Sequence, residues 1–164
     1  MKKSDMRQQL VQLGNGAHAL ATQMLGNPDD AADAVHDAFV KVFRKPHAYD
    51  PKSGPLTPWF LRVVRNHCID VIRRRRPSGG DVDELSDLRP GPQASLEIVQ
   101  RDQGLQLALA KLPDGQRQII VLRDYMDLSY AEIAQVLELA QGTVMSRLHR
   151  ARLALKEELS RDDQ

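Results

Sequence analysis

The sequence predicts an all-α protein: two small helical domains joined by a flexible linker, with a helix-turn-helix in the second. Apolar residues recur at helical spacing in both halves. Only seven of the 164 residues are aromatic, fewer than a large β-sandwich normally uses. A stretch rich in Pro, Gly and Asp interrupts the helical pattern near the middle. We therefore expect domains at 1–76 and 95–164, with the linker at 77–94.

The charge is segmented along the chain, although the formal net charge is only +1. Residues 1–76 carry 13 basic and 7 acidic side chains, whereas residues 77–100 carry 1 and 5. Residues 101–164 are nearly balanced, with 9 basic and 10 acidic side chains. A basic block beside an acidic connector is compatible with a nucleic-acid partner, which the net charge alone argues against.

Several classes of protein are disfavoured. The single cysteine, Cys68, excludes a disulfide framework and suits a reducing cytoplasm. The charged start is not followed by the apolar run of a signal peptide, and no stretch approaches the roughly 18 apolar residues of a membrane helix. The five histidines are dispersed, so we predict no metal and no cofactor. Ser129 has no base positioned with it and Cys68 is expected to pack in the core, so we do not expect an enzyme.

Local signals divide the first half into helices. Apolar residues at helical spacing over 10–24 predict one helix, and the Gly-Asn-Pro-Asp run at 26–29 ends it. We expect Asp29 or Asp30 to cap the next helix. After a loop at 46–58, Thr57 is expected to cap a long helix with Pro58 in its first position, running to about residue 75. Its inner face comprises Leu61, Val64, Cys68, Val71 and Ile72.

The second half predicts four helices, at 95–110, from Pro113, at 129–137 and at 141–159. Ser129 and Glu132 have the spacing of a capping box, which marks the start of the third. The third and fourth helices, joined by a short turn, have the form of a helix-turn-helix. The last helix has a buried seam of Val144, Leu148, Ala151 and Leu155.

Donor side chains lie beside this seam and suit a DNA major groove. Arg can bridge guanine O6 and N7, while Ser and Thr bond to phosphate or base. The alternative is a helical hairpin with a solvated basic face, and spacing alone does not decide between them. The candidate residues are Thr143, Ser146, Arg147 and Arg150, with Arg152 extending the positive surface.

Three blocks at 112–123, 128–134 and 142–152 resemble the C-terminal promoter-binding domain of extracytoplasmic-function sigma factors. The resemblance implies that Thr143, Ser146, Arg147, Arg150 and Arg152 face the −35 element. The sequence departs from the family pattern at three positions. Met145 stands where Lys is usual, Glu138 where Gly is usual in the turn, and Ala140 where Ser is frequent. A left-handed Glu138 costs about 1 kcal/mol and a lost cap about 1 kcal/mol, so we expect weak or unusual −35 recognition.

Aromatic and basic residues are concentrated in the first half. Five of the seven aromatics fall between residues 39 and 60, and Trp59 begins a helix that ends in the arginine run 73–76. An aromatic beside a basic helix suits single-stranded DNA, because bases stack on the ring while phosphates meet arginine. The alternative is that Trp59 belongs to the core and the arginines form a solvated helix end favoured by the dipole.

The stretches 29–43 and 59–74 resemble the other half of the same family. The first implies a helix that docks on the clamp helices of the polymerase largest subunit, and the second a helix that recognises and melts the −10 element. The loop between them resembles the family's specificity loop, which holds a flipped-out base. The implied docking residues are Asp33, Val35, His36, Asp37, Phe39 and Lys41. The implied −10 residues are Tyr49, Asp50, Lys52, Trp59, Arg62, Asn66 and Arg73.

Both blocks occur in the family's order with the expected gap. The resemblance therefore implies a cytoplasmic sigma factor, whose partners are core RNA polymerase, promoter DNA and an inhibitory anti-sigma factor. The acidic linker is expected either to thread the RNA-exit region or to act as a solvated tether. A stand-alone helix-turn-helix regulator and a degenerate sigma relative that acts as an interaction protein are the alternatives. Polymerase binding and promoter opening distinguish these readings.

Overall fold

The computed structural model describes residues 3–75 and 103–162, and every regular element within these two ranges is helical. The all-α class is therefore confirmed. The linker predicted at 77–94, and the start of the helix expected from residue 95, lie outside the described residues. No helix in the described ranges is both long and apolar enough to cross a membrane.

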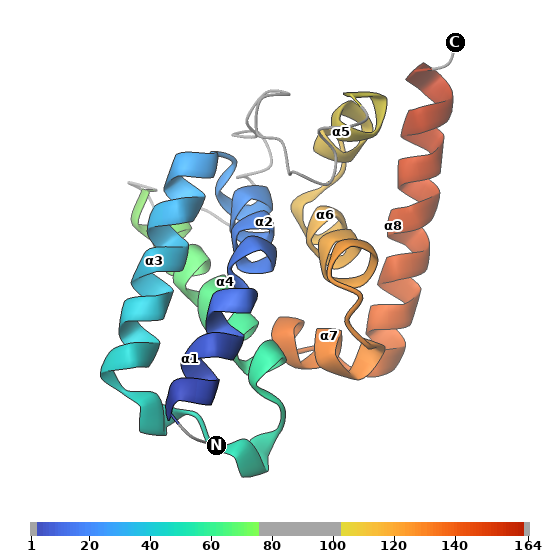
Figure 1. The fold of residues 1–164 in the computed structure, drawn as a ribbon. Helices are drawn as coiled ribbons and strands as arrows, with labels where there is room; N and C mark the ends of the chain where they lie inside the picture. Colours follow the sequence, from blue (N-terminus) through green and yellow to red (C-terminus); the bar gives the residue numbers. More distant parts are fainter. Residues whose placement is uncertain (1–2, 76–102, 163–164) are drawn as a thin grey trace.

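Four helices form the first half (Figure 1): α1 (Lys3–Gln12), α2 (Gly14–Leu25), α3 (Pro28–Arg44) and α4 (Leu56–Arg75). α2 packs against both α3 and α4, and α3 packs against α4. Phe60, Leu61 and Val64 of α4 are completely buried in the resulting core, as are Leu10 and Leu20. The predicted inner face of α4 is confirmed at Leu61, Val64, Cys68 and Ile72, whereas Val71 is only half-buried.

The boundary between α2 and α3 lies where the sequence places it, but a different residue caps α3. Gly26 ends α2 in the left-handed region with φ 80°, and its N–H donates to the Thr22 carbonyl. The Asn27 side chain then accepts hydrogen bonds from the backbone N–H groups of Asp29 and Asp30. The prediction that Asp29 or Asp30 caps the helix is wrong, because Pro28 occupies the first helical turn and moves the cap to the preceding residue.

The connection from α3 to α4 contains two single 3₁₀ turns, η1 (Pro46–Ala48) and η2 (Pro51–Ser53). α4 begins at Leu56, so Thr57 and Pro58 lie inside its first turn rather than at the cap and first position. The first backbone N–H groups of a helix have no partner within it, so a proline in this turn removes no helical hydrogen bond.

The second half contains α5 (Gln103–Ala110), α6 (Asp114–Ile120), the π-helical turn η5 (Val121–Tyr125), α7 (Tyr130–Leu137) and α8 (Gln141–Asp162). The capping box is confirmed: the Glu132 N–H donates to Ser129 Oγ, and the Ser129 N–H donates to the Glu132 carboxylate. α7 and α8 form the helix-turn-helix, and α8 also packs against α5 and α6.

Glu138 ends α7 in the left-handed region, with φ 57° and ψ 48°. The expectation of a left-handed residue in this turn is therefore confirmed. Asp127, which precedes α7, has a similar φ of 56°. Positive φ is unfavourable for a side chain with a Cβ, although Asp tolerates it better than Glu.

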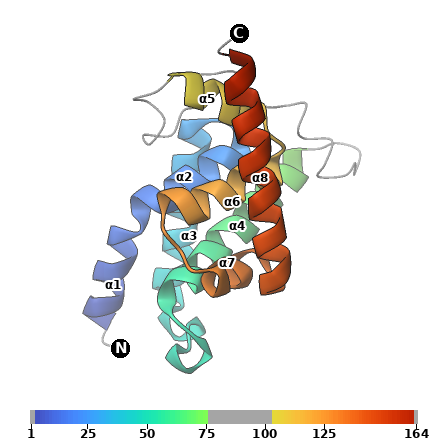
Figure 2. The ribbon, with the colours of Figure 1, turned by 90° about the vertical axis from the view of Figure 1, so that its right-hand side faces the viewer.

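The two halves pack against each other (Figures 1 and 2). α7 lies against α4, while α6 and η5 lie against α2. Arg65 Nε donates to Gln118 Oε1 at 3.2 Å, and the buried Arg117 guanidinium donates to the Gln23 carbonyl oxygen at 3.2 Å. Apolar periodicity does not predict this contact, because the residues that it joins are far apart in the sequence.

Candidate nucleic-acid interface and docking face

The exposed face of α8 carries the donors predicted to meet duplex DNA. Val144, Leu148 and Ala151 are buried, so the predicted apolar face of α8 packs against the protein and the opposite face is exposed. Arg147 and Arg150 are exposed, and their side chains make no hydrogen bond or ion pair with the described residues. Both guanidinium groups therefore remain available to phosphates or base edges. Leu155, predicted in the seam, is half-buried.

The other predicted donors of α8 are more constrained. Thr143 is half-buried, and Ser146 Oγ donates to the Thr143 carbonyl at 3.1 Å. Arg152 forms an ion pair with Asp124 of η5, and this hydrogen-bonded carboxylate raises the pKa of Arg152. In this structure the charge of Arg152 is thus matched within the protein.

Two further residues of α8 bear on its outer surface. Met145 is 53% exposed, an unusual position for a large apolar side chain. His149 is also exposed, and it was not among the predicted residues. It lies three residues after Ser146, which places both side chains on one side of the helix. This spacing in the sequence could have predicted that His149 lies on the exposed face.

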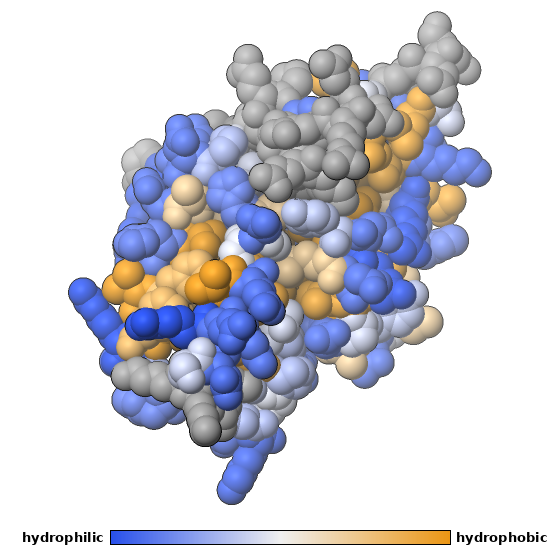
Figure 3. Space-filling view, viewed as in Figure 1, coloured by the Kyte–Doolittle hydropathy of each residue, from blue (hydrophilic) through white to orange (hydrophobic). Residues whose placement is uncertain are grey.

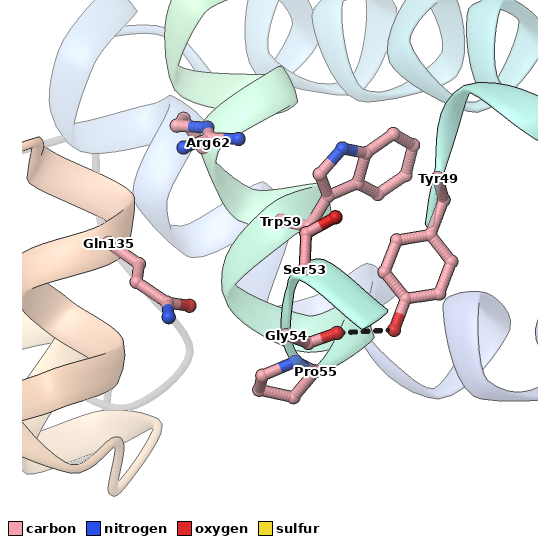
Figure 4. Close-up of a pocket in the computed structure, with 7 residues that line it drawn as sticks. All are labelled: Tyr49, Ser53, Gly54, Pro55, Trp59, Arg62 and Gln135. Carbon is pink, nitrogen blue, oxygen red and sulfur yellow. Dashed lines mark hydrogen bonds between the residues drawn. The ribbon is translucent and has the colours of Figure 1, made fainter. Parts of the chain in front are cut away.

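A cavity of about 190 Å³ opens where the α3–α4 connection meets the first turns of α4 (Figure 4). Tyr49 is buried, and its hydroxyl donates to the Gly54 carbonyl at 2.7 Å, which fixes the loop. Burial, and secondarily the Asp50 carboxylate, raises the pKa of this phenol. The Tyr49 and Trp59 ring centroids are 5.1 Å apart. The cavity is lined by Tyr49, Ser53, Gly54, Pro55, Trp59, Arg62 and Gln135.

The position of Trp59 is compatible with both of the alternatives that the sequence left open. Its side chain is half-buried and packs against the hydrophobic core, and it also lines the cavity. An aromatic held in this way has limited rotational freedom, which favours stacking by an entering base.

Asp50 and Lys52 divide their roles within the loop. The Asp50 carboxylate accepts from the Lys52 backbone N–H at 3.0 Å and caps η2, so its main visible role is to shape the turn. The Lys52 side chain is exposed beside the cavity loop.

The polar side of α4 is covered at one end and open at the other. Arg62 and Arg65 are half-buried beside the second half, whereas Asn66 and Arg73 are exposed. Burial lowers the pKa of Arg65, an effect that the nearby Glu138 carboxylate opposes. Gln135 of α7 faces the cavity together with Arg62 (Figure 4). The sequence could not predict this participation, because Gln135 belongs to the other half.

The predicted docking residues of α3 separate into an outer and an inner set. Asp33, His36, Asp37 and Lys41 are exposed. Val35 is only 7% exposed and belongs to the core. Phe39 is half-buried and stacks on Phe43 and Phe60, with ring centroids 5.9 and 5.0 Å apart. The polar side chains thus form a surface that the two apolar residues support from beneath.

Hydrophilic side chains cover much of the face seen in Figure 3, with apolar surface over the helices on the left and along the upper part of α8. Phe43 and Val11 are among the exposed large hydrophobic residues, and the Arg7 guanidinium lies 5.3 Å from the Phe43 ring centroid. No cluster of three His, Cys, Asp or Glu residues suited to a metal ion occurs within the described ranges. Cys68 is buried, and desolvation raises its pKa to about 12.

Known proteins share this organisation. Residues 10–78 match the family model for sigma-70 region 2, and residues 102–155 match that for sigma-70 region 4. The ECF RNA polymerase sigma factor SigE of Mycolicibacterium smegmatis is 34% identical over 149 residues, which are 88% of this chain and 57% of SigE. The ECF RNA polymerase sigma factor RpoE of Cereibacter sphaeroides is 30% identical over 131 residues, covering 79% of this chain and 72% of RpoE.

A solved structure is similar over almost the whole chain. The sigma factor RpoE from Bartonella quintana, in complex with the anti-sigma factor NepR, has a TM-score of 0.72 at 28% identity. The similarity covers 95% of this chain and 97% of that one. The fold and the two matched regions define a helical transcription protein of the sigma-70 class. The chain belongs to the extracytoplasmic-function (ECF) sigma factors of RNA polymerase.

Proposed function

We propose that this sigma factor docks on core RNA polymerase through α3, reads the −35 element with α8 and opens the −10 element with α4 and its preceding loop. The observation that carries the proposal is the pairing of two different DNA-facing surfaces on one chain. α8 presents unpaired arginines suited to duplex DNA, while α4 begins at an aromatic cavity suited to an unpaired base.

For the −35 element, α8 provides Arg147 and Arg150 from its exposed face, with Ser146 and Thr143 nearer its start. The N-terminus of a helix also favours a phosphate group. Arg152 contributes once DNA phosphates compete with Asp124 for its guanidinium. Met145 stands where the family usually has Lys. The missing positive charge lowers the contribution of DNA phosphate contacts to binding.

For the −10 element, the cavity lined by Tyr49 and Trp59 receives one flipped base, which stacks on the exposed part of Trp59. Flipping a base costs a few kcal/mol, and stacking on an aromatic returns roughly 1–3 kcal/mol per base. Arg62, Asn66 and Arg73 then follow the strand along α4, with Lys52 approaching from the loop. Asp50 acts through the loop shape that it caps.

Promoter binding requires the two halves to separate. Gln135 of α7 faces the cavity, and Arg62 and Arg65 are half-buried beside the second half. While α4 and α7 remain in contact, the two halves cannot bind promoter elements that are separated along the DNA. Core polymerase supplies the binding energy for opening, because the docked halves gain contacts that the free protein lacks.

An anti-sigma factor is the proposed inhibitor. The similar Bartonella quintana RpoE was crystallised with NepR, which is the support for extending such a partner to this chain. The proposed location is the cytoplasm, where the polymerase works, and the protein acts as a polymerase subunit rather than as an enzyme.

The decisive experiment is transcription by purified core polymerase plus this chain on genomic DNA, with sequencing of the transcripts. We expect starts at a defined set of sites that share −10 and −35 sequences, and no such starts with core alone. Specific duplex binding by the isolated chain, without polymerase-dependent starts, would instead identify a stand-alone regulator. Polymerase binding without promoter opening would identify an interaction protein.

A further inference from the structure

A buried histidine of α4 contacts two of the docking residues of α3. His67 is only 8% exposed, yet its side chain reaches the outer side of α3. Its Nδ1 lies 3.0 Å from the Lys41 ammonium, and its Nε2 lies 3.4 Å from the Asp37 carboxylate. Asp37 and Lys41 are four residues apart, so they occupy neighbouring positions on one helix face. The histidine therefore bridges an exposed acid and an exposed base from below.

The chemistry of the partners fixes the direction of this bridge. A Lys ammonium can only donate, so Nδ1 of His67 must accept. A neutral ring then carries its hydrogen on Nε2, which points toward the negative Asp37. This nitrogen is buried and makes no hydrogen bond that meets the usual geometric limits, so the 3.4 Å approach to Asp37 is its main polar contact.

Packing alone does not account for a histidine at this position. Its neighbours Val64 and Cys68 are completely buried and apolar. A leucine would fill similar space without burying a polar ring atom, which is unfavourable unless it is well paired. The useful result of the histidine is that two mobile surface side chains acquire a common anchor.

We propose that His67 is a positioning residue for polymerase docking: it holds the Lys41 ammonium and the Asp37 carboxylate in a fixed arrangement on the surface of α3. The inference rests on the proposed docking role of α3. Because ordering these side chains before contact reduces the entropy lost on binding, removal of the anchor weakens the complex without removing either charge.

The test compares His67→Leu with His67→Gln for affinity to core polymerase. Leucine removes both polar contacts, so we expect affinity to fall about five- to tenfold. Glutamine retains one acceptor and one donor, and we expect it to stay within about twofold of the wild type. Lys41→Met should weaken binding less in the His67→Leu background than in the wild type, because the effects of coupled residues are not additive.

The matched control is His18→Leu. This change removes another histidine contact in the same half, 3.0 Å from the Pro28 carbonyl oxygen, away from Asp37 and Lys41. We expect unchanged affinity for this control, and similar thermal unfolding for all variants that are compared. Wild-type affinity for His67→Leu, or additive losses with Lys41→Met, would overturn the positioning role.

A second measurement needs no polymerase and separates this inference from the proposed function. Nitrogen NMR of the free protein should place the hydrogen of the neutral His67 ring on Nε2. A hydrogen on Nδ1 would overturn the proposal whatever the binding result. Failure of wild-type protein to bind core polymerase, with the Nε2–H form present, would instead count against the docking role of α3.

Discussion

The two helices that we propose to contact DNA, α4 and α8, are exposed to different degrees in the same molecule. α8 exposes Arg147 and Arg150 and keeps its apolar seam against its own half. The first turns of α4 instead lie against α7, which half-buries Arg62 and brings Gln135 to the cavity. The difference shows that residue chemistry identifies a surface, whereas packing between the halves decides whether that surface is accessible.

The contact between the halves combines polar links with apolar packing. Its specific links include the Arg65–Gln118 hydrogen bond and the bond from Arg117 to the Gln23 carbonyl. Each of these groups can be satisfied by water after separation. Apolar packing accompanies these polar links, because buried residues of both halves belong to one hydrophobic cluster, so separation also exposes apolar surface.

The largest expected effect comes from Trp59→Ala. Loss of base stacking should slow promoter opening about 10- to 100-fold, while polymerase binding stays nearly constant. Fluorescence of a base analogue in the −10 element reports opening, and Trp59→Phe is the control that keeps a stacking ring. Equal loss of opening and polymerase binding would show that Trp59 serves the core alone.

Arg147→Ala should weaken use of the −35 element by about 1–3 kcal/mol if the side chain meets a base. Arg152→Ala should have a smaller effect, because Asp124 already neutralises that guanidinium. Transcription from promoters with altered −35 bases measures both. If Arg152→Ala proved the more damaging change, the outer face of α8 would have been assigned incorrectly.

Gly16→Leu should shift the free protein toward separated halves. A Cβ at this position would lie 2.3 Å from Cε of Met126. Met126 directly follows η5, so this contact joins the two halves. Because Met side chains are adaptable, we expect a shift of about 1 kcal/mol, seen as a larger radius of gyration by small-angle scattering. Gly14→Leu is the matched control, since nothing lies within 4 Å of a Cβ there. Identical scattering from both variants would argue against a separable contact.

Glu138→Gly should raise the free energy of unfolding by up to about 1 kcal/mol, because glycine adopts the left-handed turn without strain. Asp127→Gly should gain less, since Asp tolerates positive φ better than Glu. Denaturant unfolding of the two variants measures this difference. A loss of stability in Glu138→Gly would mean that the attraction between Glu138 and Arg65 outweighs the backbone strain.

Local features of the fold were predictable because each depends on neighbouring residues. The capping box at Ser129 and most of the α8 seam follow from short patterns, whereas the left-handed Glu138 was expected from the family resemblance. Asn27 was missed as a cap because Asn and Asp both cap well, and the proline between them decides. No local sequence pattern predicted the π-helical turn η5.

The sequence named candidate site residues but not their arrangement in space. Tyr49, Trp59 and Arg62 do line one cavity, as the family resemblance implied for the −10 residues. Gln135 was not foreseen, because it approaches from the other half. The contact of His67 with Asp37 and Lys41 depends on how α4 crosses α3, which helical periodicity does not specify.

The most direct test of the central claim is energy transfer between dyes on the exposed positions Gln8 of α1 and Glu157 of α8, placed through cysteine substitutions. Cys68 should remain unlabelled, because it is buried and its pKa is raised to about 12. We predict lower transfer in a complex with core polymerase and promoter that is making RNA than in the free protein. Transcription with transfer unchanged from the free protein would contradict the account.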